Sequence, residues 1–137
     1  MSTLPQLTDA LLTLENRVAT LTMNRHDLRN ALTGSHLIDD IVATAEWVNR
    51  CEEVSVLVIT GAGSAFSAGG NIRDMAERGG DFAGDPAECA ERYRKGIQRI
   101  PLALDAVEVP VIAAVNGPAI GAGFDLANIC LLYKSPS

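Results

Sequence analysis

The sequence predicts an α/β fold with a mainly parallel sheet, because strand-like and helix-like segments alternate along the chain. Two runs of strand length, residues 54–60 (VSVLVIT) and 109–115 (VPVIAAV), are apolar and rich in β-branched side chains. Such runs are typical of strands covered on both faces, as in parallel sheets. Each run leads into a glycine-rich loop, and helical patterns lie between the strands. This rhythm of strand, loop and helix is characteristic of α/β proteins.

The N-terminal part predicts a pair of strands followed by a helix. Residues 11–15 and 18–23 have the composition of two short strands separated by a two-residue turn. Residues 35–49 carry apolar side chains three and four positions apart, which is the spacing of an amphipathic helix. Thr33 or Ser35 can cap the start of this helix.

The second half of the chain continues the alternation. Residues 71–86 predict a short helix and then a flexible segment with several glycines. A long helix is expected over residues 86–106, with a bend or break before Pro101. Residues 118–130 (PAIGAGFDLANIC) indicate a glycine loop that opens into another helix. The closing residues 131–137 (LLYKSPS) contain one further short strand.

Composition limits both the class of protein and its partners. The chain has 137 residues, of which 47% are hydrophobic, so we expect a single domain over residues 1–137. The net charge of −6 disfavours a general nucleic-acid binder, because affinity for phosphate depends on clustered Lys and Arg. Three widely spaced cysteines without a CxxC pair are expected to be reduced thiols of a cytoplasmic protein, with no metal site. No apolar run is long enough to span a membrane, and no stretch resembles a signal peptide.

The two glycine loops suggest where a ligand binds. Both loops follow a strand, and in parallel sheets ligands bind at the carboxyl ends of the strands. The loop 61–71 (GAGSAFSAGGN) lacks the Lys-Ser/Thr of a P-loop and the third glycine of GxGxxG, and residues 117–123 fit neither motif. Phosphate binding of these types is therefore disfavoured. Two loops that each contribute one backbone N–H group favour a developing carbonyl oxyanion as the group that is bound.

Three segments in this order resemble one known family. The segments are RVATLTMNRHDLRNAL, VSVLVITGAGSAFSAGGNIRDM and VPVIAAVNGPAIGAGFDLA. Together they resemble the N-terminal half of the crotonase superfamily, the family of enoyl-CoA hydratases and isomerases, over roughly residues 11–129. The resemblance implies a crotonase-like ββα spiral core, truncated here because the C-terminal part of the family's domain is lacking.

The resemblance also implies an acyl-CoA thioester substrate whose carbonyl oxygen lies between two backbone N–H groups. The family's positions for these donors correspond to Gly70 and Ala122. The family places an acid–base carboxylate three residues after the second donor, which is Asp125 here. Most hydratases have Glu at that place and some isomerases have Asp, so the residue type favours isomerisation. The alternative role for Asp125 is to complement the positive end of the helix dipole.

Contacts to coenzyme A are implied for the first loop and for the segment after the second strand. Ala68, Gly70 and Ile72 correspond to backbone positions beside the adenine and the pantetheine arm. Arg25 or Arg29 could meet a CoA phosphate. The alternative for either arginine is a solvated charge on a surface loop.

Two classes of function remain open at this stage. In the first, the chain is an enoyl-CoA hydratase or isomerase that needs no separate cofactor, since coenzyme A is part of the substrate. In the second, it is an inactive truncated fragment that binds CoA weakly or acts as an interaction module, because the second carboxylate of the hydratases would lie beyond Ser137. Nucleotide binding ranks third. We expect a homo-oligomer, since the apolar strands and helix need cover on more than one side.

Overall fold

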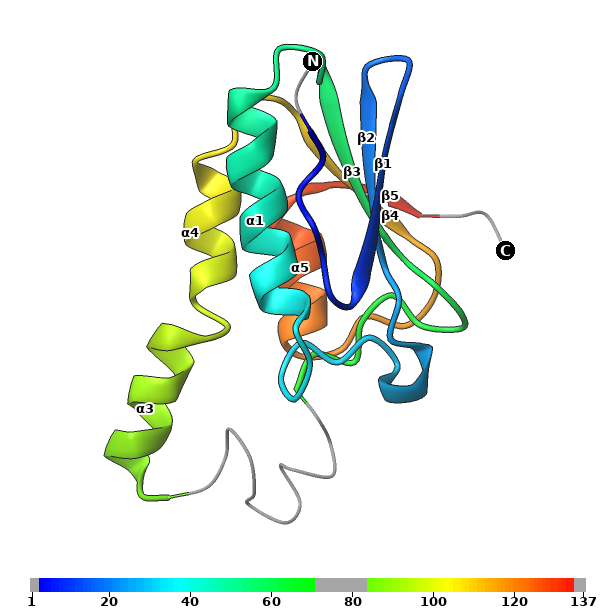
Figure 1. The fold of residues 1–137 in the computed structure, drawn as a ribbon. Helices are drawn as coiled ribbons and strands as arrows, with labels where there is room; N and C mark the ends of the chain where they lie inside the picture. The colour runs from blue at the N-terminus through cyan, green and yellow to red at the C-terminus, as the bar shows by residue number, and fades with distance from the viewer. Residues whose placement is uncertain (1–2, 71–83, 135–137) are drawn as a thin grey trace.

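A five-stranded sheet with helices on one face is the main feature of a computed structural model that describes residues 3–70 and 84–134 (Figure 1). The strands are β1 (Ala10–Glu15), β2 (Val18–Met23), β3 (Val56–Gly61), β4 (Val111–Val115) and β5 (Leu131–Lys134). Their order in the sheet is the same as their order in the chain. The pairs β2–β3, β3–β4 and β4–β5 are parallel, so the prediction of a mainly parallel α/β sheet is confirmed.

The strands β1 and β2 form an antiparallel hairpin. Asn16 and Arg17 connect them and have φ angles of 52° and 68°. Two successive left-handed residues are the geometry of a type I′ turn, whose twist matches that of the flanking strands. Both predicted strands and their two-residue turn are confirmed, with β1 beginning one residue earlier than expected.

Four α-helices accompany the sheet in the described residues: α1 (Leu37–Arg50), α3 (Pro86–Lys95), α4 (Arg99–Asp105) and α5 (Ala122–Ile129); a short 3-10 helix, η1 (His26–Leu28), follows β2. Helices α1, α4 and α5 lie on one face of the sheet, while α3 extends away from the body (Figure 1). The predicted break before Pro101 lies between α3 and α4. The cap residue of α1 is His36, and the hydroxyl of Ser35 accepts a hydrogen bond from the Leu37 N–H at 3.3 Å.

The core lies between these helices and the sheet. On β3, Leu57 and Ile59 point into the core and are buried, whereas Val56 and Val58 are only half-buried. The expectation that this strand is covered on both faces is therefore wrong for the part of the chain that the structure describes. In that part, no helix lies on the opposite face of the sheet. The apolar, β-branched composition of this strand reflects high β propensity, and it does not show that both faces of the strand are buried.

The loops after β2, β3 and β4 meet at one end of the sheet, the lower end in Figure 1. This follows from the parallel pairing, because parallel strands bring their carboxyl ends to the same edge. Residues 24–36, 61–70 and 116–121 therefore lie together, and α5 begins among them. None of the helices formed by the described residues combines the length and apolar character of a membrane-spanning helix. The predicted short helix after residue 71 lies outside the described residues.

Candidate active site

Two isolated β-bridges join the three loops at this end of the sheet. Ala31 pairs with Gly69, and Ser67 pairs with Ala119. The first glycine loop is thus hydrogen-bonded on one side to the loop after β2 and on the other side to the loop after β4. Two segments that are far apart in sequence are held against the first glycine loop.

The two predicted N–H donors lie on loops that touch. Gly69 has a φ of +76°, and a Cβ atom placed on it would lie 2.8 Å from the Ala122 nitrogen and 2.5 Å from the Ile120 carbonyl oxygen. A side chain at position 69 would collide with the second loop, so glycine is required there. Among residues 3–70 and 84–134, no atom accepts a hydrogen bond from the backbone N–H of Gly70 or of Ala122.

The second loop ends in a turn that begins α5. Gly121 is the cap residue, with a φ of 56° that favours glycine. Ala122 is the first helical residue, so its N–H has no partner within the helix. Asp125 lies in the first turn, and its own N–H bonds to the Gly121 carbonyl at 3.0 Å. The Asp125 side chain is exposed, and no described residue bonds to its carboxylate.

The two arginines proposed for coenzyme A differ in their surroundings. Arg25 donates to both oxygens of Asp27 at 3.0 Å and to the Asp9 carboxylate at 3.2 Å. These partners, Asp27 foremost, raise the pKa of Arg25 above its usual range. Arg29 is exposed, and no described residue pairs with its guanidinium group. Of the two, only Arg29 has a guanidinium group that no described residue pairs with.

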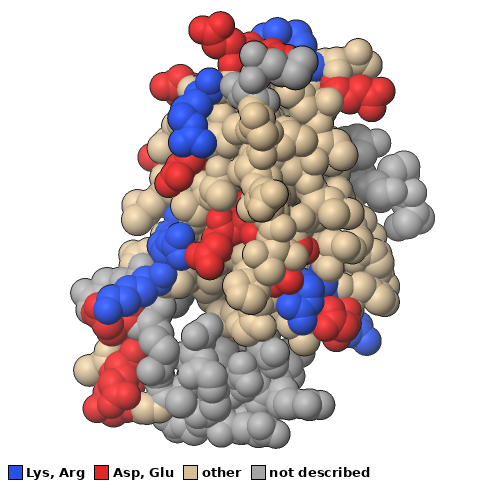
Figure 2. Space-filling view, in the orientation of Figure 1, with Lys and Arg blue, Asp and Glu red and all other residues tan. Residues whose placement is uncertain are grey.

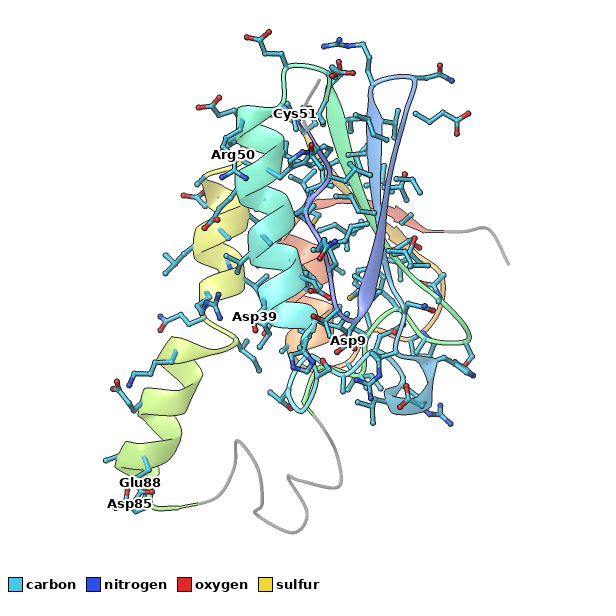
Figure 3. All side chains as sticks on the ribbon, in the orientation of Figure 1. Asp9, Asp39, Arg50, Cys51, Asp85 and Glu88 are labelled. Carbon is cyan, nitrogen blue, oxygen red and sulfur yellow. The ribbon has the colours of Figure 1, made fainter. Side chains whose placement is uncertain are left out.

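The remaining CoA positions lie on the first loop. Ala68 is half-buried, and its N–H donates to the Arg29 carbonyl at 2.9 Å, which places the loop beside the segment after β2. Ile72 lies outside the described residues. Asp9, which pairs with Arg25, lies beside the start of α1 at the same end of the molecule (Figure 3).

The sequence reasoning missed two buried polar residues at the junction of the loops. Asn30 and Ser67 are both 0% exposed. The Asn30 side chain accepts from the Arg25 N–H at 2.8 Å and donates to the carbonyls of Ala62 and Ala65 at 3.1 Å each. A signal was available for Ser67, a polar letter that stands inside the otherwise apolar stretch AFSAG, whereas Asn30 follows the polar segment RHDLR.

The cysteines and acidic residues of the described part of the chain were also compared with the geometry of metal and thiol sites. No group of three His, Cys, Asp or Glu side chains there is arranged to hold a metal ion. Cys51 and Cys130 are buried free thiols. Burial raises the pKa of the Cys130 thiol to about 11, which disfavours a nucleophilic role. The side chain of Cys89 lies outside the described residues.

A shallow pocket lies elsewhere on the molecule. Its volume is about 220 Å³, and it is lined mainly by apolar residues at the C-terminal end of α4, the start of β4 and the end of α5, including Leu104, Val107, Val109 and Ile129. Because it lies at the amino end of β4, it is separate from the glycine loops. In Figure 2, the described acidic and basic side chains on the visible face are intermingled and do not form a continuous basic surface.

Comparisons with known proteins agree with this arrangement. The family model for enoyl-CoA hydratase/isomerase matches residues 13–133. A probable enoyl-CoA hydratase of Mycobacterium tuberculosis is 37% identical over 123 residues, which cover 89% of this chain and 44% of that protein. The 2,3-dehydroadipyl-CoA hydratase of Escherichia coli is 34% identical over 124 residues, covering 90% and 45%.

Solved structures of enoyl-CoA hydratases are also similar to this chain. An enoyl-CoA hydratase from Shewanella pealeana superimposes with a TM-score of 0.81 at 25% identity, covering 94% of this chain and 47% of that one. An enoyl-CoA hydratase subunit from Geobacillus kaustophilus superimposes with a TM-score of 0.78 at 35% identity, covering 96% and 48%.

The fold and the two glycine loops thus define a crotonase-like α/β protein. The chain belongs to the enoyl-CoA hydratase/isomerase family, the crotonase superfamily, and the resemblance read from its sequence is confirmed. It spans a little under half the length of the relatives that it matches.

Proposed function

We propose that this chain acts on an unsaturated acyl-CoA thioester as a hydratase or isomerase of the enoyl-CoA type. The observation that carries the proposal is the contact between the two glycine loops, which brings the N–H groups of Gly70 and Ala122 to one end of the sheet without a described acceptor for either. Two such donors suit a thioester oxygen that becomes negative as an enolate forms. Each donor of this kind typically contributes about 3–4 kcal/mol to the transition state.

Asp125 is the proposed acid–base group. Its carboxylate is exposed at the start of α5, three residues after Ala122. In an isomerisation it would take a proton from one carbon of the acyl chain, giving the enolate, and return the proton to another carbon, so that the double bond moves. In a hydration it would assist the transfer of a proton to or from water. The Asp in place of Glu supports isomerisation over hydration.

Binding of the substrate is proposed to involve the first loop and one arginine. Ala68, Gly70 and Ile72 would contact the CoA moiety, and Arg29 would meet a phosphate. Arg25 is assigned instead to the loop's own structure, because it is paired with Asp9 and Asp27. Coenzyme A enters as part of the substrate, with no separate cofactor. We place the reaction in the cytoplasm.

We also propose that the chain associates with copies of itself. Four large apolar side chains in the second half of the molecule are 43–69% exposed: Leu102, Ile120, Phe124 and Ile129. The apolar pocket at the end of α4 adjoins Ile129. Apolar surface of this kind tends to be covered by a partner.

The test of the oxyanion site is Ala122→Pro. Proline is well tolerated at the first position of a helix, yet it removes the N–H group. We expect turnover of a 3-enoyl-CoA or of crotonyl-CoA to fall by about 100-fold or more with an unchanged melting temperature. The matched control Ala122→Gly keeps the N–H and should retain most activity. Unchanged turnover in a folded Ala122→Pro variant would exclude this donor. A wild-type chain that binds acyl-CoA without turnover would favour the non-catalytic alternative.

A further inference from the structure

Ser67 is the residue at which all three loops of the site are joined. Its side chain is fully buried. The hydroxyl donates to the Asn30 carbonyl at 2.8 Å and accepts from the Gly69 N–H at 3.1 Å. A buried hydroxyl is costly unless it is hydrogen-bonded, and here it serves both as donor and as acceptor. One hydroxyl therefore ties the segment after β2 to the first glycine loop.

The backbone of Ser67 makes the connection to the second loop. The Ser67 carbonyl accepts from the Ile120 N–H at 3.0 Å, and the Ser67 N–H donates to the Pro118 carbonyl at 3.3 Å. A Cβ atom on Gly123 would lie 2.4 Å from the Ser67 carbonyl oxygen, so the first turn of α5 packs directly on this residue. These contacts fix the position of Ala122 relative to Ser67.

The backbone of Asn30, whose carbonyl accepts the hydrogen bond from the Ser67 hydroxyl, is itself held in place by other contacts. Its φ of 57° is left-handed, and its side chain bonds to Arg25, Ala62 and Ala65. These contacts fix the Asn30 backbone, whose carbonyl is the acceptor for Ser67. The hydroxyl thus bonds to a fixed group and not to a loose loop.

The orientation of the Gly70 N–H follows from the peptide that it shares with Gly69. In a trans peptide the C=O and the next N–H point in opposite directions and lie in one plane. The Gly69 carbonyl accepts from the Leu32 N–H at 2.5 Å, and the Gly69 N–H donates to Ser67. With both polar groups of Gly69 fixed, the direction of the Gly70 N–H is fixed as well.

We propose that Ser67 is a positioning residue, whose hydroxyl acts through Gly69 to hold the Gly70 N–H at a set angle and distance from the Ala122 N–H. The idea rests on the proposed function, since it assigns these two amides to one thioester oxygen. Catalytic groups must be held within about 0.5 Å and 10–20° of the productive geometry. Loss of the hydroxyl would therefore weaken the polarisation of the bound carbonyl more than it weakens the binding of coenzyme A.

The test compares Ser67→Ala with Ser64→Ala. Ser64 is an exposed serine of the same loop, and no described residue bonds to its hydroxyl, so the chemical change is matched. In the ligand-free protein, Ser67→Ala should speed hydrogen exchange of the Gly69 amide by roughly five-fold, the loss of one neutral hydrogen bond. It should also shift the NMR signals of the Gly70 and Ala122 amides. Ser64→Ala should change none of them.

A second readout uses an acyl-CoA labelled with ¹³C at the thioester carbonyl. The bound carbonyl signal should move toward its value in solution in Ser67→Ala, while the dissociation constant changes by less than about two-fold, and kcat should fall with KM nearly unchanged. A residue that only supports folding would lower the melting temperature without this split. Ser67→Cys, which keeps a weaker donor and acceptor, should give an intermediate effect and serves if the alanine variant does not fold.

The two proposals fail in different ways. A wild-type chain that binds no acyl-CoA would remove the proposed function, and the amide measurements would still decide the role of Ser67. Amide exchange and shifts in Ser67→Ala that match those in Ser64→Ala would overturn the positioning role, even in an active enzyme.

Discussion

Asp125 stands out among single residues because its carboxylate is exposed and has no described partner. If it moves protons, Asp125→Asn should lower kcat by about 100-fold or more, since Asn keeps the shape and lacks the ionisable group. The free energy of unfolding should fall by less than about 1 kcal/mol, because Asn loses only the interaction of the charge with the helix dipole. Steady-state kinetics and thermal unfolding measure both quantities. Asp105→Asn, an exposed aspartate away from the loops, is the control, and equal turnover of the two variants would remove the acid–base role.

Asp9 contributes stability that depends on pH. Burial alone would raise its pKa, but the His36 N–H, which donates to it at 2.6 Å, and the Arg25 guanidinium outweigh burial and lower the pKa below its usual value. A lowered folded-state pKa means that the ionised group stabilises the fold above the unfolded-state pKa of about 3.9. This contribution is lost as the pH falls from about 4 through the folded-state pKa.

Urea unfolding at pH 6 and pH 3 measures this effect. The wild-type midpoint should fall more between the two values than the midpoint of Asp9→Asn, which has no carboxylate to protonate. Asp105→Asn should behave as wild type. The same decline in Asp9→Asn and in wild type would mean that another group dominates acid unfolding.

The site could be predicted from the sequence only where neighbouring letters carry the information. Gly70, Ala122 and Asp125 were assigned by resemblance to the family's motifs, and their roles stay predictions. Asn30 and Ser67 were not found, because the bonds that join the loops, from Asn30 to Ala65 and from Ser67 to Asn30, link residues more than 30 positions apart and leave no periodic pattern. The resemblance made Arg25 and Arg29 equal candidates for binding a CoA phosphate. Only the structure distinguishes them, because Arg25 is paired with Asp9 and Asp27.

At the scale of elements, a buried carboxylate fastens the N-terminal strand to α1. Asp40 is 3% exposed, and its two oxygens accept from the N–H groups of Thr8, Asp9 and Ala10 at 2.7–3.0 Å. Asp40→Asn would present an NH₂ group to some of these donors. We expect a loss of about 3 kcal/mol of unfolding free energy, since hydrogen bonds to charged groups contribute about 1.5–3 kcal/mol each.

The control for this prediction is the neighbouring Asp39→Asn. Asp39 lies one position earlier in the first turn of α1 (Figure 3), has a side chain that is 64% exposed, and pairs with Arg99 at 2.7 Å. Such exposed ion pairs typically contribute below about 1 kcal/mol. Chemical denaturation of both variants provides the comparison. A similar cost for the two would show that Asp40 acts only as a first-turn acid.

Elements were predicted well where periodicity and turn residues agree. All five strands and α1 lie within three residues of their expected bounds, α5 falls inside the expected segment 118–130, and the break between α3 and α4 was anticipated from Pro101. The burial of only one face of β3 was not predicted, because a strand rich in Val and Ile can have the same composition whether one face or both faces are buried. Only the placement of the helices decides that question.

For the whole molecule, the exposed apolar side chains make association testable. Light scattering should give a mass that is a multiple of the monomer's 14.5 kDa. Leu102→Glu, at a side chain that is 69% exposed on α4, should lower that mass. Leu11→Glu, at a side chain that is 56% exposed on β1, is the matched control. A monodisperse monomer at high concentration would contradict self-association, and an effect of Leu11→Glu alone would place the contact on the sheet edge.

The order of the strands has a consequence for synthesis on the ribosome. Each strand joins the edge formed by the strand before it, so no later segment must be inserted between strands that are already paired. Domains tend to assemble from the N-terminus as the chain emerges, and near-neighbour pairing shortens the loops that must close. We expect the hairpin to form first, after which α1 returns the chain so that β3 pairs with the free side of β2. From the hairpin to β5, each described strand pairs with the free edge of the strand that was made just before it.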